Sequence, residues 1–373
     1  MNSTVKSSDA RAGGGHRIGS LDGLRSIAIL LVLAGHCCDN YFRSDGIPNW
    51  VEEIIGNSSF GVRLFFVLSG FLITSLLIKE RQATGRVSLA RFYLRRTLRI
   101  FPAFYLYVGT ILLLTVFGVL KISGSQFLAA MTYTWNYNGL WIHHGTVEGS
   151  WFLGHLWTLA LEEQFYLCWP LLFILIPFFS LRWIPVVAAL TLPMVRIVTY
   201  YAVPEWRGYL GMMFHTAIDS ILIGCGFAIW TGSLSTPKVL RSLKSLLPLI
   251  LLIPLVVSPL LRARFGGAYS VTLGMTMDAL CVGSLLILLI NQSAGKGLTT
   301  LLTASPLQWL GRLSYSLYLW QQLFLTNLNY TWTGYFPISL VAALVAACLS
   351  YYLVETPLMR FKNRFVDVRI TQS

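Results

Sequence analysis

The stretch LDGLRSIAILLVLAGH, residues 21–36, is the part of the sequence that decides the fold. It is apolar between Arg25 and His36 apart from Ser26, and it approaches the length that an α-helix needs to cross a bilayer. A helix turns about 100° and rises about 1.5 Å per residue, so these two side chains lie on one face, about 16 Å apart. An ionisable residue inside a membrane span is costly and by default indicates function.

The composition of the whole chain agrees with a membrane protein. Apolar residues make up 55% of the 373 residues and charged residues only 12%, whereas soluble domains carry about 25%. The chain therefore lacks the polar surface of an ordinary soluble enzyme. Its net charge of +13 would indicate nucleic acid in a soluble protein, but here it fits basic loops facing anionic lipid. We expect contact with membrane lipid and no nucleic-acid partner.

No metal site is predicted. The six cysteines show neither CxxC nor zinc-finger spacing and fall in or beside apolar stretches. His143, His144 and His155 are close in sequence, but no cysteine or carboxylate beyond Glu148 stands at ligand spacing from them.

The hydropathy pattern predicts an all-α, polytopic membrane helix bundle of about ten transmembrane helices. The spans are expected near residues 18–38, 60–78, 101–120, 155–178, 183–201, 212–232, 245–261, 270–291, 305–327 and 336–354. The stretch 127–135 is apolar but short, and we interpret it as re-entrant or interfacial.

Basic residues orient these spans. With the N-terminus in the cytoplasm, the cytoplasmic segments hold 19 of the 28 Lys and Arg residues and the outer segments hold six, among them Arg63. This asymmetry predicts that both termini are cytoplasmic. The expected organisation is an N-terminal tail at 1–16, a membrane domain at 17–358 and a C-terminal tail at 359–373.

Ionisable residues separate by depth in this arrangement. The cytoplasmic half carries Arg25 and an arginine-rich loop, in which Arg96 and Arg99 are one helical turn apart and can clamp one anion together. The outer half carries His36 and Glu162. Glu163, His215, Asp219 and Asp278 complete the outer set, which predicts a shared polar chamber near the outer surface.

This separation suggests group transfer across the bilayer. The cationic inner site suits a phosphorylated donor, and coenzyme A fits because its nucleotide end is anionic and its pantetheine arm is slender. An imidazole near the outer surface suits general-base activation of an acceptor hydroxyl.

Six motifs in order resemble the acyltransferase-3 family of integral membrane O-acyltransferases. They are LDGLRSIAILLVLAGH (21–36), FFVLSGFLIT (65–74), FYLRRTLRIFPAFYLY (92–107), LWTLALEEQFYL (156–167), GRLSYSLYLW (311–320) and VETPL (354–358). The resemblance covers residues 17–362. It implies ten spans in a bacterial cytoplasmic (inner) membrane and an acyl-CoA donor, most often acetyl-CoA. The implied acceptor is a hydroxyl of an envelope or exported carbohydrate, such as O-antigen or exopolysaccharide.

The resemblance also assigns residues. It makes His36 the main catalytic residue with Arg25 as its partner, and it gives Arg96 and Arg99 to the donor. Glu162, rather than Glu163, matches the signature carboxylate. As general base, His36 would activate the acceptor hydroxyl, either directly or through an acyl-imidazole.

For three residues, the sequence itself allows more than one interpretation. Arg25 either contacts the donor or forms an ion pair with Asp22. Glu162 holds an acceptor hydroxyl, tunes His36, or bonds to Tyr166 one turn on. Ser69 lines the pantetheine path, or it serves close helix packing together with Gly70.

Two departures from the family pattern stand out. Gln321 follows the LYLW motif where many members have histidine, so any role of that ring is absent here. The resemblance also predicts a stand-alone membrane domain without the C-terminal esterase-like domain of two-domain members. Transfer is then completed by the membrane domain alone or with a partner protein.

Two other functions remain open from the sequence. The same chemistry could act on a small lipophilic acceptor such as a macrolide. Alternatively, His36, Glu162 and Asp219 could form the proton relay of a secondary transporter.

Overall fold

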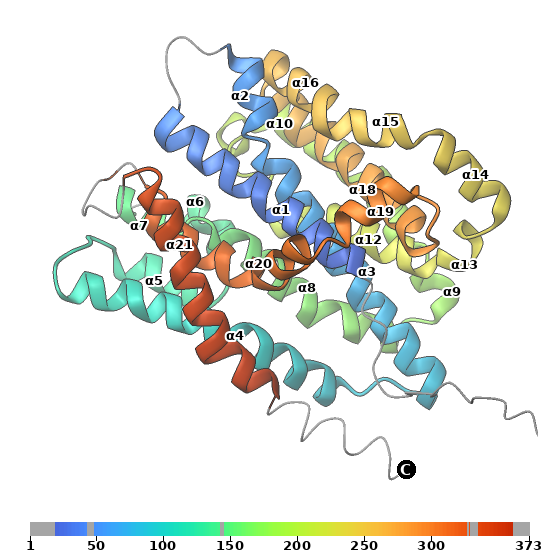
Figure 1. Cartoon of the computed structure of the whole chain (residues 1–373), viewed down its shortest axis with the longest axis horizontal. Coiled ribbons are helices and arrows are strands. Elements are labelled where there is room, and N and C mark those ends of the chain that lie inside the picture. The colour runs from blue at the N-terminus through green and yellow to red at the C-terminus, as the bar shows by residue number, and fades with distance from the viewer. Residues whose placement is uncertain (1–18, 43–47, 142–144, 327, 329–334, 361–373) are drawn as a thin grey trace, which may run out of the picture.

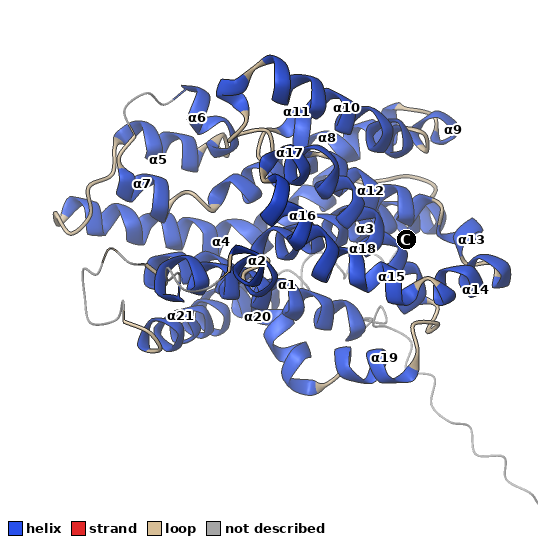
Figure 2. Cartoon of the chain, turned by 90° about the horizontal axis from the view of Figure 1, so that it is seen from above, coloured by secondary structure: helices blue, strands red, loops and turns tan. Residues whose placement is uncertain are grey.

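The structure, a computed structural model, describes residues 19–42, 48–141, 145–326, 328 and 335–360. The predicted tail at 1–16, most of the tail at 359–373, and His143 and His144 lie outside these ranges. The described residues form helices and loops without a strand (Figure 2), which confirms the all-α prediction.

The main helices of the bundle follow one another along the chain. They are α1 (Gly19–Cys37), α3 (Ser58–Thr84), α4 (Leu89–Val116), α8 (Leu156–Leu175), α10 (Ile184–Ala202), α12 (Asp219–Ile229), α15 (Leu247–Leu252), α16 (Ser258–Phe265), α18 (Met275–Ile290), α20 (Ser305–Phe324) and α21 (Ile338–Leu349).

Short α-helices and short 3₁₀- and π-helical segments precede, connect or follow them. They are η1 (Cys38–Phe42), α2 (Asn49–Ile55), α5 (Gly124–Met131), η2 (Trp135–Tyr137), α6 (Asn138–Trp141), α7 (Val147–Phe152), α9 (Phe178–Leu181), η3 (Pro204–Trp206), α11 (Phe214–Ala217), α13 (Thr231–Leu234), α14 (Pro237–Ser245), η4 (Ile253–Val257), α17 (Gly267–Tyr269), η5 (Ser270–Gly274), α19 (Lys296–Leu302) and η7 (Ser350–Glu355).

Eight helices within the described ranges are long and apolar enough to cross a membrane. They are Gly19–Phe42, Asn49–Thr84, Leu89–Val116, Leu156–Leu175, Phe178–Ala202, Leu247–Phe265, Gly267–Ile290 and Ile338–Arg360. Each coincides with a predicted span, which confirms a polytopic membrane bundle. The count of ten stays a prediction, as does the side on which the termini lie.

The two other predicted spans coincide with α12 and α20, which fall short for physical reasons. α12 has 11 residues, nearly all buried, and packs against α3, α10 and α18. α20 carries Arg312, Gln321 and Gln322, and it packs between α1 and α21. A helix surrounded by protein needs neither the length nor the apolarity of one that faces lipid.

The arginine-rich segment 91–99 differs from the prediction of a loop. It is the first part of helix α4, which begins at Leu89 and is capped by the side chain of Ser88. The short apolar stretch 127–135 forms the end of α5 and the turn after it.

Close helix contacts fix the centre of the bundle, where α1 lies beside both α3 and α20 (Figure 1). A Cβ atom at Gly70 of α3 would lie 1.9 Å from the carbonyl oxygen of Ile221 in α12. A Cβ atom at Gly311 of α20 would lie 1.9 Å from the carbonyl oxygen of Asp22 in α1. These glycines let the backbones touch, so the packing interpretation of Gly70 is confirmed.

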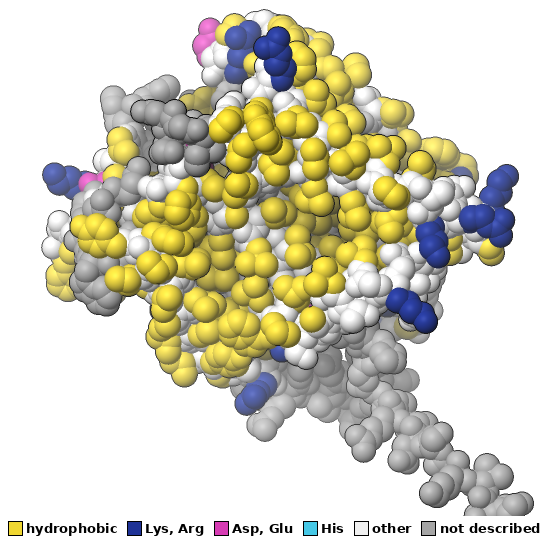
Figure 3. Space-filling model, turned by 45° about the horizontal axis from the view of Figure 1, so that its top comes forward, with side chains coloured by type: hydrophobic (Ala, Val, Ile, Leu, Met, Phe, Trp, Pro, Cys, Tyr) yellow, Lys and Arg dark blue, Asp and Glu magenta, His cyan; other side chains and the backbone are white. Residues whose placement is uncertain are grey.

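The surface is that of a protein surrounded by lipid. Hydrophobic side chains cover most of the face shown in Figure 3, and Lys and Arg lie at its edges. Long apolar side chains on α4 and α10 are more than half exposed, including Leu113, Val116, Leu190 and Val198. The chain is therefore a multi-pass membrane protein.

Candidate active site

The residues predicted to hold the donor line one cavity. It has a volume of about 110 Å³ and is lined by Arg25 from α1, Ser69 from α3, Arg96 and Arg99 from α4, and Glu162 from α8. We call it the arginine cavity. The tertiary fold thus brings four separate helices to the site at which the sequence predicted anion binding.

Helical spacing explains why only two of the α4 arginines reach this cavity. Arg91 and Arg95 are one turn apart and face Glu80 of α3, at 4.0 Å and 3.2 Å. Arg96 and Arg99 lie on another side of the helix and line the cavity. The first pair shares one carboxylate, whereas the guanidinium of Arg96 lies 4.9 Å from the ring centre of Tyr166.

A hydrogen-bonded chain of three side chains crosses the arginine cavity. Tyr166 donates to Glu162 at 3.1 Å, and the hydroxyls of Tyr166 and Ser69 are hydrogen-bonded to each other. Glu162 therefore makes the predicted bond to Tyr166 and also faces the cavity. Ser69 also lines the cavity, as a place along the pantetheine path would require, and that role stays a prediction.

Arg25 makes the predicted ion pair, and its contact with the donor stays a prediction. Its Nη1 lies 3.4 Å from Oδ1 of Asp22, so the ion pair exists. The same side chain lines the arginine cavity. The ion pair with Asp22 therefore places the Arg25 guanidinium at the wall of this cavity.

His36 lines a second, larger cavity of about 620 Å³ at the other end of α1, which we call the histidine cavity. Its wall includes Arg63 of α3, the buried His155, and the indoles Trp135, Trp151 and Trp157. Its polar lining also includes the amides of Asn136, Asn138 and Gln322. None of the described residues that line it is an aspartate or a glutamate.

Gln321 holds the ring of His36. Its Oε1 lies 2.7 Å from Nδ1 of His36, and its Nε2 donates to Oε1 of Gln322 at 3.1 Å. Gln322 in turn donates to the carbonyl oxygen of Trp151. A carbonyl oxygen only accepts, so Nδ1 of His36 carries the proton and Nε2 keeps its lone pair. The residue that departs from the family pattern is thus the direct partner of the imidazole.

The two cavities adjoin. Val62 of α3 and Tyr318 of α20 line both. The hydroxyl of Tyr318 is hydrogen-bonded to Thr158 at 2.7 Å and donates to the carbonyl oxygen of His155 at 2.9 Å. The arginine cavity and the histidine cavity therefore meet at these two side chains.

The predicted outer chamber of histidine and carboxylates is wrong. Glu162 lines the arginine cavity, whereas His36 lines the other. Asp278 accepts a hydrogen bond from Ser258 at 2.6 Å and borders a separate small cavity. His215 is exposed and bonds to Tyr137 at 3.0 Å. Residues at one depth on different helices can face different neighbours, and the sequence does not determine helix rotation.

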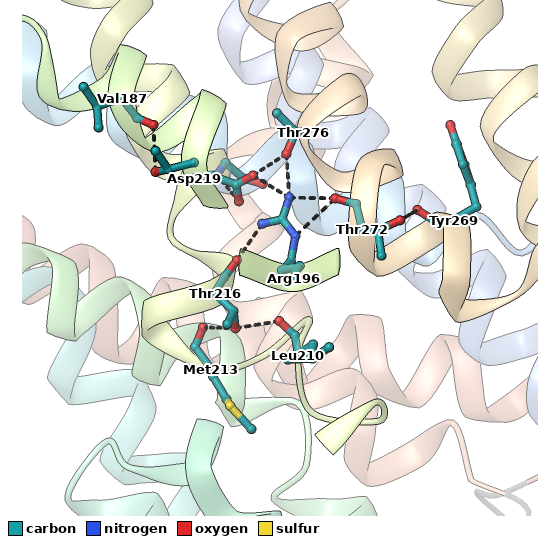
Figure 4. A network of polar contacts seen from close by, with 11 residues as sticks. Val187, Arg196, Leu210, Met213, Thr216, Asp219, Tyr269, Thr272 and Thr276 are labelled. Atoms are coloured by element: carbon teal, nitrogen blue, oxygen red, sulfur yellow. Dashed lines mark hydrogen bonds and ion pairs between the residues drawn. The ribbon is translucent and has the colours of Figure 1, made fainter. Parts of the chain in front are cut away.

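Asp219 belongs to a sealed network (Figure 4). It pairs at 2.9 Å with Arg196 of α10, and both side chains are fully buried. Arg196 also donates to the carbonyl oxygens of Thr216 and Thr272 and to the hydroxyl of Thr276. His36, Glu162 and Asp219 thus occupy three different places, so the structure does not form the relay proposed for a transporter.

Sequence reasoning missed two residues of the histidine cavity. Arg63 was counted among outer basic residues, although it stands three positions inside the predicted span 60–78 and is only 7% exposed. His155 was considered only as a metal ligand, although it directly precedes the signature that begins at Leu156. In both cases the position within the predicted span was the available signal.

Comparison with known proteins decides the family. A model described as an acyltransferase domain matches residues 18–355, nearly the whole chain. The chain belongs to the acyltransferase-3 family. It is therefore an enzyme of the acyltransferase class, and the predicted family membership is confirmed.

Curated relatives agree with this assignment. The chain is 30% identical to a peptidoglycan O-acetyltransferase, OatA, of Listeria monocytogenes, over 93% of this chain and 56% of the relative. It is 28% identical to the O-acetyltransferase OatA of Staphylococcus aureus, over 91% of this chain and 57% of the relative. The chain thus spans little more than half the length of these relatives. No solved structure matches it.

Proposed function

We propose that the chain is a membrane O-acetyltransferase of the bacterial cytoplasmic membrane. It moves an acyl group, most simply acetyl, from cytoplasmic acyl-CoA to a hydroxyl of an envelope carbohydrate. The observation that carries this proposal is the pair of adjoining cavities along α1, one lined by arginines and the other by an imidazole with a free Nε2. The relatives' O-acetyltransferase activity supports acetyl as the group transferred.

The arginine cavity is the proposed donor site. Arg96 and Arg99 are the two α4 arginines without a carboxylate partner within the described residues, which suits them to the phosphates of coenzyme A. Glu162, Tyr166 and Ser69 form a hydrogen-bonded chain beside them. We assign this chain to orienting the pantetheine arm, and Glu162 acts there rather than on the acceptor.

The histidine cavity is the proposed acceptor site. Three tryptophans offer flat apolar faces to a sugar ring, and amide side chains offer hydrogen bonds to its hydroxyls. Oδ1 of Asn138 is buried and has no hydrogen-bond partner within the described residues, so it is available to a hydroxyl donor.

The proposed reaction joins the two sites at Val62 and Tyr318. Nε2 of His36 accepts the proton of the acceptor hydroxyl while the oxygen of that hydroxyl attacks the thioester carbonyl. The carbon–sulfur bond then breaks, and the imidazolium returns the proton to the leaving thiolate, giving an ester and free coenzyme A. An acyl-imidazole intermediate would use the same nitrogen as nucleophile and remains an alternative path.

Release of free coenzyme A tests the proposal directly. We expect purified protein in liposomes to convert labelled acetyl-CoA to coenzyme A when an envelope glycan is supplied, and O-acetyl NMR signals to appear on that glycan. Ester on an added macrolide but not on glycan would favour the small lipophilic acceptor. Solute exchange without any release of coenzyme A would contradict acyl transfer altogether.

A further inference from the structure

Arg63 is a buried cation that forms no ion pair with any of the residues that the structure describes. It is 7% exposed, and its Nη1 is buried without a hydrogen bond in the described parts of the chain. Its guanidinium carbon lies 5.8 Å from the ring centre of Phe66, and no carboxylate of the described residues lies within ion-pair distance. Burying such a charge is energetically unfavourable unless something compensates it.

Neither of the two carboxylates nearest to this region, Asp219 and Asp278, forms an ion pair with Arg63 within the described residues. Asp219 pairs with Arg196. Asp278 borders a cavity of about 70 Å³ together with Arg63 and Arg262, and it accepts a hydrogen bond from Ser258. Arg262 has its own partner, Glu53, at 3.2 Å.

The other side of Arg63 faces the histidine cavity, which is large and lacks a lining carboxylate. Its ionisable lining groups are the cation of Arg63, two imidazoles and two tyrosines. An anionic group on a bound molecule would supply the missing counter-charge there.

We propose that Arg63 binds an oxyanion, a carboxylate or a phosphate, carried by the acceptor itself. The inference rests on the proposed acceptor role of the histidine cavity and specifies its substrate class as an anionic saccharide. Because Arg63 and His36 line one cavity, the anion and the hydroxyl to be acylated belong to one molecule. Arg63 then fixes which hydroxyl reaches Nε2 of His36.

Binding of two matched oligosaccharides to the full chain in detergent tests this inference. One is a tetrasaccharide of alternating N-acetylglucosamine and glucuronic acid, and the other is the same molecule with its carboxyl groups reduced to alcohols. We expect the protein to bind the carboxylated form about tenfold or more tightly. Arg63→Gln should abolish that preference, and Arg63→Lys should retain part of it.

A control and a competitor complete the design. Arg262→Gln removes an arginine that borders only the small cavity and should leave the preference unchanged. Inorganic phosphate that competes with the carboxylated form shows that a phosphorylated acceptor also suits the site, whereas lack of competition restricts it to carboxylates.

Three results would overturn the inference. The unaltered chain could bind the carboxylated and reduced tetrasaccharides equally or not at all. The preference could survive Arg63→Gln, or Arg63→Gln could bind both tetrasaccharides as the unaltered chain does and lose only turnover. Release of coenzyme A with an envelope glycan is measured separately, so failure of the acyl transfer remains distinguishable from failure of the anion site.

Discussion

The two buried arginines Arg63 and Arg196 show how differently two regions of this bundle use the same side chain. Around Arg196, helices α10, α12 and α18 enclose a cation bound to a carboxylate and to three further acceptors. Around Arg63, helices α1, α3 and α8 border a cavity, and the buried Nη1 of the cation has no hydrogen-bond partner among the described residues. A buried charge whose hydrogen bonds are satisfied within the protein needs no ligand, whereas an unsatisfied one favours binding of an opposite charge.

This contrast predicts that substitutions along the cavities alter catalysis and that substitutions in the sealed region alter stability.

The largest effect is expected at His36. His36→Ala removes the proposed base and should lower kcat by about 10²- to 10⁴-fold. The measurement is coenzyme A release by purified protein.

The matched control is His215→Ala, which removes an exposed imidazole bonded only to Tyr137 among the described residues. It should leave turnover near the level of the unaltered chain. Equal losses in both variants would mean that His36 has no special place in the reaction.

Arg196→Met tests the sealed region. It leaves Asp219 as a buried carboxylate without its ion-pair partner, so the free energy of unfolding should fall by about 3–5 kcal/mol. Thermal unfolding in detergent measures the loss.

Combining Arg196→Met with Asp219→Leu should recover much of that stability, because both charges are then absent. By contrast, Arg63→Met should leave the midpoint of thermal unfolding unchanged or raise it. A strong destabilisation by Arg63→Met would erase the difference between the two regions.

Arg96→Gln tests the donor site within one helix. Loss of a charge-assisted contact to phosphate should raise KM for acetyl-CoA by about tenfold or more, with a smaller change in kcat. Arg95→Gln is the neighbouring control, since Arg95 faces Glu80 rather than the cavity. Similar KM values for the two variants would remove Arg96 from donor binding.

The smallest expected effect lies at Gln321. Gln321→Met keeps the volume but removes the acceptor that holds the proton on Nδ1 of His36. A neutral hydrogen bond contributes about 0.5–1.5 kcal/mol, so kcat should fall by about two- to tenfold while KM for acetyl-CoA stays constant. An unaltered kcat would show that the His36 ring is oriented by its other neighbours.

The sequence predicted the helical class well because span length and apolarity are local properties. All eight helices that can cross a membrane coincide with predicted spans. The two remaining predicted spans were harder to judge, since α12 and α20 are enclosed by protein and their length and polarity reflect those neighbours. The arginines of segment 91–99 lower its apolarity and so predict a loop, although α4 already begins at Leu89.

At the site, the sequence alone determined how the candidate residues are spaced along each helix: Arg25 and His36 eleven positions apart, and Arg96 and Arg99 one turn apart. Only the tertiary structure decided how they are grouped. Helix rotation and packing placed Glu162 with the arginines, set Gln321 against His36, sealed Asp219 against Arg196 and left Arg63 facing a cavity. The physical reason is that spacing fixes a residue's place on its own helix, whereas its partner depends on which other helix covers that face.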